Sequence, residues 1–175
     1  MAKRKAVFLD RDGVLIKSDV VEGKPIAIQD IDRLELIPGV EEACGILRAQ
    51  GYLLVMVTNQ PDIGRGLVTR AVVDEMNNRL VAALGLSGVR VCHHSDSDKC
   101  TCRKPEPGMI VEAAREMNID LGRSMMVGDR WRDIEAGRRA GCRTVYIDWG
   151  HGEPITVAPD YAAASLLRAV AWICS

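Results

Sequence analysis

Short apolar runs recur along the chain, and each is followed by polar or turn-forming residues. They lie at residues 7–9, 53–57, 89–92, 124–127 and 143–148. The run at 53–57 reads LLVMV without a polar interruption, which is typical of a strand covered on both faces of a sheet. The pattern therefore predicts five strands.

Between these runs, apolar residues recur at the spacing of one helix face. We expect helices from Val40 to a stop at Gly51, after a Thr69 cap, after Pro107, from Ile134 to Ala140 before Gly141, and after a Ser165 cap. The expected buried faces are Val40, Ala43, Cys44 and Leu47; Val72, Val73, Met76, Leu80 and Ala83; Ile110, Ala113, Ala114 and Met117; and Leu166, Ala169, Val170 and Ile173.

Strands that alternate with helices form right-handed βαβ units and a parallel sheet with helices on both faces. The predicted fold class is therefore α/β, a doubly wound parallel sheet. Residues 16–37 show no clear period and are expected to form a loop or a small hairpin flap, and Asp62–Gly66 a loop. Because the 175 residues hold neither a repeat nor an interdomain linker, we expect one domain, 1–175.

Composition and charge narrow the classes of function. Aromatic residues make up 4% of the chain and the formal net charge is −1, so the sequence offers neither a base-stacking platform nor a basic surface for nucleic acid. No apolar run approaches the roughly 20 residues of a membrane span, and the run after the basic N-terminus is too short for a signal peptide. We expect a cytoplasmic monomer with no nucleic-acid or membrane partner.

The first apolar run ends in two carboxylates, Asp10 and Asp12, followed by Gly13. In an extended segment residues i and i+2 point to the same side, so both carboxylates are expected to face one pocket. Two carboxylates so close repel each other unless a cation lies between them, and oxygen ligands of this kind suit Mg²⁺. The alternative is a plain strand end with an Asp-Gly turn.

Polar residues also follow two further strands. Thr58 and Asn59 come after the second predicted strand, and Gly128 and Asp129 after the fourth. Ligands of such sheets bind beyond the carboxyl ends of the strands, where these residues are expected to meet. Lys104, in the loop before the fourth strand, completes a set of carboxylates, hydroxyl and amine.

Three of the six cysteines crowd between Cys92 and Cys102, next to His93 and His94. Three thiols and an imidazole in eleven residues can close a tetrahedral zinc site, whose role is structural when all four positions are protein ligands. The alternative is three unrelated buried cysteines. The remaining cysteines, Cys44, Cys142 and Cys174, are expected to be packing residues.

Four segments together resemble the motifs of the haloacid dehalogenase (HAD) superfamily: DRDGV at 10–14, TNQ at 58–60, CRKPEPGM at 102–109 and GDRWRDIEAG at 128–137. Within it the chain is similar to the class III phosphatases of heptose bisphosphates and histidinol phosphate. The resemblance implies a Rossmann-like core without a cap domain. It also implies a structural Zn²⁺ bound by Cys92, His94, Cys100 and Cys102, with His93 left out.

The resemblance assigns roles to the motif residues. Asp10 is implied to be the nucleophile that forms an aspartyl-phosphate, and Asp12 the general acid and base. Asp10, Asp129 and the backbone carbonyl of Asp12 are implied to bind Mg²⁺. Thr58 and the Asn59 amide are expected to hold phosphate oxygens, while Lys104 neutralises charge in the transition state.

Other assignments stay open at this stage. Arg103 is expected to bind a second phosphate or acidic group of the substrate, or else to remain solvated, and Arg130 is a further candidate substrate contact. Asp133 is expected to orient Lys104 or a metal-bound water, or to be an acidic residue at a helix start. Pro61 departs from the usual group pattern after Gln60 and removes a backbone donor.

The predicted function is a Mg²⁺-dependent phosphatase acting on a small phosphorylated metabolite, with a heptose bisphosphate as the leading substrate. Histidinol phosphate is the alternative within the same class. From other classes, a phospho-accepting receiver or a zinc-stabilised binding module remains. A receiver carries its phosphorylated aspartate on the third strand, whereas here the carboxylate pair follows the first.

Overall fold

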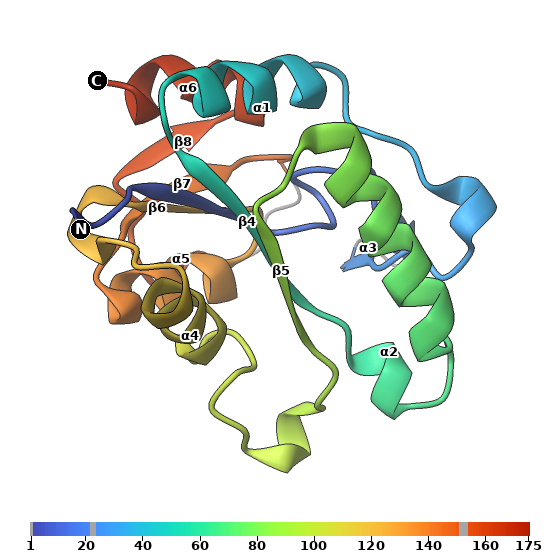
Figure 1. Ribbon diagram of the computed structural model, residues 1–175. Helices are drawn as coiled ribbons and strands as arrows, with labels where there is room; N and C mark the ends of the chain where they lie inside the picture. Colours follow the sequence, from blue (N-terminus) through green and yellow to red (C-terminus); the bar gives the residue numbers. More distant parts are fainter. Residues whose placement is uncertain (1, 22–23, 151–153) are drawn as a thin grey trace.

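The computed structural model describes residues 2–21, 24–150 and 154–175. Its main sheet has six parallel strands in the order β5-β4-β1-β6-β7-β8 (Figure 1). The strands are β1 Ala6–Leu9, β4 Leu53–Asn59, β5 Gly88–Cys92, β6 Met125–Gly128, β7 Arg143–Ile147 and β8 Tyr161–Ala163. The helices are α1 Val40–Ala49, α2 Pro61–Gly64, α3 Arg70–Leu84, α4 Gly108–Glu116, α5 Trp131–Ala140 and α6 Leu166–Ile173.

Alternate residues of the central strands supply two cores on opposite faces of the sheet. Val7 and Leu9 of β1 belong to the core that contains buried residues of α1, α3 and α6. Ala6 and Phe8 belong to the core that contains buried residues of α4 and α5. Because both faces are covered, β1 is entirely buried, and the predicted doubly wound α/β fold is confirmed.

The sequence pattern identified most of these elements. All five predicted strands are present, and Thr69 and Ser165 cap their helices with side-chain hydrogen bonds to Val72 N and Arg168 N. Strand β8 was not predicted, because its three residues carry no period. The α3 face was partly wrong: Ala83 is exposed, whereas Asn77 and Leu84 are buried.

Two boundaries also differ from the predictions. Helix α5 begins at Trp131 rather than Ile134, because polar residues in its first turn concealed its start. Pro61 is the first residue of the one-turn helix α2 within the predicted loop. A missing N–H costs little there, since the first amides of a helix have no intrahelical partner.

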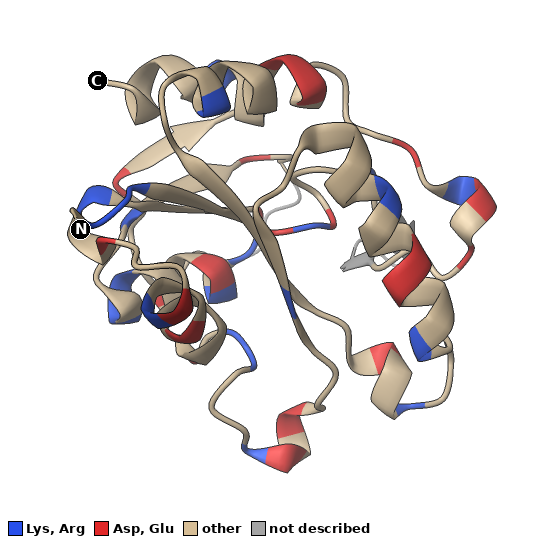
Figure 2. Ribbon diagram, in the orientation of Figure 1, with Lys and Arg blue, Asp and Glu red and all other residues tan. Residues whose placement is uncertain are grey.

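The predicted flap contains an antiparallel pair, β2 Asp19–Val21 and β3 Lys24–Ile26. A single 3₁₀ turn, Ile31–Arg33, lies between this hairpin and α1. Residues 22–23 lie outside the described part of the chain. Figure 2 shows basic and acidic residues interspersed over the helices and loops. No helix among the described residues is long and apolar enough to cross a membrane.

Candidate active site

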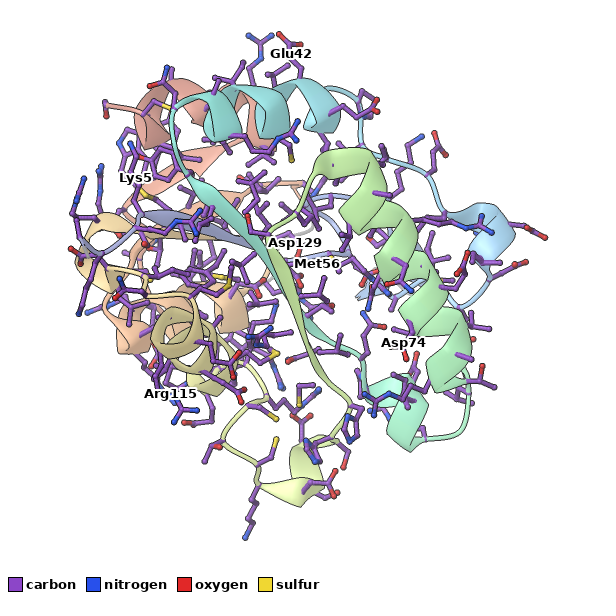
Figure 3. The ribbon with its side chains drawn as sticks, in the orientation of Figure 1. Lys5, Glu42, Met56, Asp74, Arg115 and Asp129 are labelled. Carbon is purple, nitrogen blue, oxygen red and sulfur yellow. The ribbon has the colours of Figure 1, made fainter. Side chains whose placement is uncertain are left out.

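The strand order reverses between β1 and β6, which are neighbours in the sheet although more than 100 residues separate them in the chain. Loops that leave two such strands diverge and open a crevice at the carboxyl edge. Asp10 directly follows β1 and Asp129 directly follows β6, so both border this crevice. Asp129 lies near the middle of the molecule in Figure 3. Carboxylate oxygens of Asp10, Asp129 and Asp133 lie within 4.8 Å of one another.

Lys104 reaches this acidic cluster from the loop before α4. Its Nζ donates to Asp10 Oδ1 at 2.8 Å and to the Val57 carbonyl at 2.8 Å, and lies 2.6 Å from Asp133 Oδ1. The lysine is 2% exposed. Burial alone would lower the pKa of Lys104, but the Asp10 and Asp133 carboxylates outweigh it and hold that pKa above its ordinary value. The site therefore holds a fixed positive charge.

Asn59 anchors the backbone of Lys104. Its Nδ2 donates to the Lys104 carbonyl at 3.0 Å, and its Oδ1 accepts from the Lys104 amide at 3.1 Å. This paired contact joins the end of β4 to the lysine loop. The side chain of Asn59 thus positions Lys104, while its predicted contact with a phosphate through the backbone stays a prediction.

Asp129 and Asp133 differ in how their oxygens are satisfied. Asp133 is bound on both sides, with Oδ1 at Lys104 and Oδ2 accepting from the Arg130 amide at 3.1 Å. Asp129 is buried, and its Oδ1 has no hydrogen-bond partner among the described residues. Burial, together with the charges of Asp10 and Asp133, raises the pKa of Asp129 to about 9. The free carboxylate fits a cation ligand, whereas Asp133 orients the lysine.

Asp12 does not share the partners of Asp10. Strand β1 ends at Leu9, and the chain turns at Gly13, whose φ is +85°. The Asp12 carboxylate instead lies 3.0 Å from Arg11 Nε and accepts a 2.9 Å hydrogen bond from Gln60 Nε2. That both carboxylates face one pocket stays a prediction.

Gln60 and Arg11 are site residues that the sequence analysis did not single out. Gln60 is buried, and its Nε2 donates to Thr58 Oγ1 at 2.9 Å as well as to Asp12, so it links two predicted catalytic residues. Arg11 directly follows the candidate nucleophile Asp10 and is fully buried. The sequence did offer a signal for both residues. Arg11 lies between Asp10 and Asp12 in one motif, and Gln60 directly follows Asn59 in another.

The two arginines predicted to bind substrate are placed differently. Arg103 Nε donates to Asp96 Oδ1 at 2.8 Å, and its Nη1 donates to the His94 carbonyl at 3.2 Å, so its guanidinium faces the cysteine loop. Arg103 and Arg132 hold the pKa of Asp96 well below its usual range. Arg130 is the N-cap residue just before α5, and its backbone amide donates to Asp133 Oδ2. A substrate contact of either arginine stays a prediction.

The four predicted zinc ligands converge. The three sulfurs of Cys92, Cys100 and Cys102 are 3.3–3.7 Å apart, and His94 Nδ1 lies 3.3 Å from the Cys102 sulfur. Tetrahedral zinc with bonds of about 2.3 Å spaces its sulfurs by roughly 3.8 Å, so the group fits this ion. His93 is exposed and stacks on the His94 ring.

The three cysteines outside this loop differ in burial, although all were expected to be packing residues. Cys44 and Cys142 are buried among apolar residues, as packing residues should be. Cys174 is exposed, so the expectation of a packing role is wrong for this residue, which lies just past the last turn of α6.

A family model described as haloacid dehalogenase-like hydrolase matches residues 19–141. The D-glycero-beta-D-manno-heptose-1,7-bisphosphate 7-phosphatase of Yersinia pestis is 37% identical over 95% of this chain and 91% of its own length. The D-glycero-D-manno-heptose-1,7-bisphosphate 7-phosphatase of Thermosynechococcus vestitus is 34% identical over 98% of this chain and 96% of its own length.

Solved structures agree with these relatives. The D,D-heptose 1,7-bisphosphate phosphatase of B. bronchiseptica, complexed with magnesium and phosphate, superimposes with a TM-score of 0.82 at 27% identity over 97% of both chains. A putative HAD-like phosphatase from Mesorhizobium loti gives a TM-score of 0.80 at 29% identity over 99% of this chain and 87% of its own. The chain therefore belongs to the haloacid dehalogenase-like hydrolases, in the group that holds the heptose bisphosphate phosphatases.

Proposed function

We propose that this hydrolase removes phosphate from a heptose bisphosphate through an aspartyl-phosphate on Asp10. The observation that carries the proposal is the cluster in which buried Lys104 contacts Asp10 beside the unpartnered oxygen of Asp129. A carboxylate nucleophile must approach a phosphate that is itself negative, and such a cluster supplies a positive charge at that point. The names of the relatives support the sugar bisphosphate as substrate class.

The donor set fits Mg²⁺, which prefers few carboxylates, water and substrate phosphate. Asp10, Asp129 and the Asp12 carbonyl would hold the ion. When bound, it neutralises charge on the phosphate and the attacking carboxylate. The raised pKa of Asp129 in the metal-free protein supports this assignment, because a buried carboxyl without a counter-ion retains its proton.

The remaining chemistry belongs to residues of the chain. A carboxylate oxygen of Asp10 attacks phosphorus in line, and the bond from phosphorus to the sugar oxygen breaks. Asp12 gives its proton to that oxygen, then accepts a proton from the water that hydrolyses the aspartyl-phosphate. The Thr58 hydroxyl, held by Gln60, donates to a phosphate oxygen, and Lys104 balances the transition-state charge.

We also propose that Cys92, His94, Cys100 and Cys102 bind a structural zinc ion. The ligand atoms are already grouped within bonding distance of a common centre. Cys102 lies two residues before Lys104, so a metal here stiffens the loop that carries the lysine. No ligand position is left for water, which makes a direct role in hydrolysis unnecessary.

Phosphate release by Asp10→Asn protein tests the proposal. We expect the wild type to release phosphate in Mg²⁺ and to lose activity in EDTA, most rapidly with a heptose 1,7-bisphosphate in a panel that includes hexose bisphosphates and histidinol phosphate. Asp10→Asn should abolish turnover, whereas Asp74→Asn, at an exposed carboxylate on α3, should not. Substantial turnover by Asp10→Asn refutes the nucleophile, and a preference for histidinol phosphate refutes the substrate.

A further inference from the structure

Arg11 is the largest fully buried side chain of the described residues. A guanidinium cannot be deprotonated in a protein. Its burial therefore costs free energy unless its N–H groups find acceptors and its charge is paired. Its Nε and Nη2 approach the two Asp12 oxygens at 3.0 Å and 3.4 Å as a fork. The buried charge is therefore matched by the carboxylate of the next residue.

The third contact of Arg11 comes from α3. Arg11 Nη1 donates to Asn77 Oδ1 at 3.3 Å, across 66 residues of sequence. Arginine has donors only, so the asparagine atom that faces it must be the carbonyl oxygen. The Nδ2 of Asn77 is buried and has no hydrogen-bond partner in the described part of the chain.

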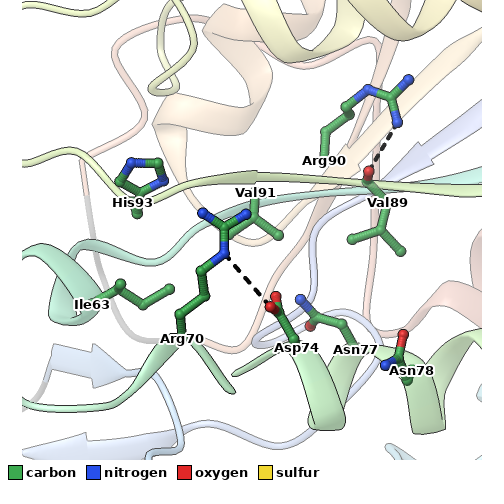
Figure 4. Close-up of a pocket in the computed structure, with 9 residues that line it drawn as sticks. All are labelled: Ile63, Arg70, Asp74, Asn77, Asn78, Val89, Arg90, Val91 and His93. Carbon is green, nitrogen blue, oxygen red and sulfur yellow. Dashed lines mark hydrogen bonds and ion pairs between the residues drawn. The ribbon is translucent and has the colours of Figure 1, made fainter. Parts of the chain in front are cut away.

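That unpartnered amide indicates a specific task for Asn77. A leucine has the same branched skeleton of side-chain heavy atoms and would occupy the position without leaving a polar group unsatisfied. Figure 4 shows Asn77 on α3 beside Asn78, at the wall of a cavity of about 420 Å³. The position thus carries a polar side chain whose one interaction is with Arg11 among the described residues.

We propose that Arg11, braced by Asn77, is a positioning residue that holds the Asp12 carboxylate for its acid and base steps. The assignment rests on the proposed function, in which Asp12 transfers both protons. Gln60 Nε2 donates to Asp12 Oδ2, the oxygen that Arg11 Nε also contacts, and to Thr58 Oγ1. The geometry of Asp12 therefore depends on Asn77 of α3 through Arg11.

Two substrates separate this role from a general structural one. In the first step p-nitrophenolate leaves without a proton, whereas a sugar alkoxide needs one from Asp12. The second step, hydrolysis of the aspartyl-phosphate, needs Asp12 as base with both substrates. Displacing Asp12 should therefore preserve the first step with p-nitrophenyl phosphate and slow the second, so that aspartyl-phosphate accumulates as a burst.

The variants are Arg11→Met and Asn77→Leu, with Asn78→Leu as the matched control on the same helix. We expect Arg11→Met to lower kcat for the sugar bisphosphate by about 10²-fold. Asn77→Leu should lower it by roughly tenfold, as for one lost hydrogen bond to a charged group. Both should release a burst of p-nitrophenolate close to one per enzyme, while Asn78→Leu behaves as wild type.

A double-mutant cycle completes the test. If Asn77 acts through Arg11, Asn77→Leu should lower kcat by less than about twofold in the Arg11→Met background. Equal loss of burst and steady-state rates, or additive effects of the two substitutions, would overturn the positioning role. A wild type that hydrolyses neither substrate in Mg²⁺ would instead refute the proposed function, and the positioning role with it.

Discussion

Lys104 Nζ lies 2.8 Å from Asp10 Oδ1, so the candidate nucleophile is paired with a buried cation before any substrate arrives. The same nitrogen lies 2.6 Å from Asp133 Oδ1. Burial raises the pKa of Asp10 to about 6, against the opposing effect of Lys104. The lysine thus keeps Asp10 ionised at neutral pH and links the loop that follows β1 to the first turn of α5.

Lys104→Met tests this link. The substitution leaves two buried carboxylates without their cation, so we expect the free energy of unfolding at pH 7 to fall by about 3 kcal/mol. It also removes a charge that faces the transition state, so kcat should fall by about 10²–10³-fold. Lys3→Met, at an exposed lysine, is the control for loss of charge. Unchanged stability in Lys104→Met would contradict the paired arrangement.

The pKa of Asp129 predicts how the metal-free protein responds to pH. Its folded pKa of about 9 lies above the ordinary value of 3.8, so the folded state binds this proton more tightly than the unfolded state. The resulting stability is complete below about pH 4 and is lost as pH rises through 9, with Asp10 contributing to the loss up to about pH 6. Denaturation in EDTA between pH 5 and 9 measures it.

Asp129→Asn supplies the matched comparison, because it removes the ionisable group and keeps its shape. At pH 8 without metal, this variant should be more stable than the wild type. Mg²⁺ should raise the melting temperature of the wild type and leave that of Asp129→Asn unchanged. Parallel pH profiles of the two metal-free proteins would show that Asp129 is not the buried proton acceptor.

The sequence identified the residues that follow strands with a strong apolar pattern. Asp10, Thr58 and Asp129 all lie at the carboxyl edge, because parallel strands bring their ends together whatever the packing details. The α/β class followed from strands that alternate with helices, whereas the family and the hydrolase assignment followed from the resemblance of the four motifs.

Other relationships depend on packing that no local pattern contains. Asn77 lies four residues after Val73 on the buried face of α3, so only a polar residue at a core position hinted at its role. Its partner Arg11 is buried and lies 66 residues away in the sequence. Similarly, the contact of Gln60 with both Asp12 and Thr58 joins two motifs that lie far apart in the sequence.

Cys100→Ser tests the proposed zinc site. We expect the protein to contain one zinc per chain and the variant to lose it, together with more than about 2 kcal/mol of stability, because binding of a structural metal contributes to folding. Activity should fall as well, since the loop leads directly to Lys104. Cys174→Ser, at an exposed cysteine outside the cluster, should keep its zinc. Full zinc content in Cys100→Ser would exclude this ligand set.

Gly13→Ala tests whether the turn after β1 shapes the magnesium site. Gly13 has φ +85°, and a Cβ there would lie 2.1 Å from Asp129 Oδ2. Gly51 has φ +81° with nothing within 4 Å of its Cβ position, so Gly51→Ala carries the same backbone strain, of order 1 kcal/mol, without the clash. Both variants should therefore lose similar stability from the backbone.

The two alanine variants should differ in their need for metal. In Gly13→Ala the methyl group displaces the Asp129 carboxylate, so half-maximal activity should require roughly tenfold or more Mg²⁺, the range for disturbed metal-ligand support. Gly51→Ala should keep the wild-type requirement. Magnesium titrations of phosphate release measure both. An unchanged requirement in Gly13→Ala would mean that Asp129 does not bind the ion, because the added methyl group cannot be accommodated while that carboxylate stays in place.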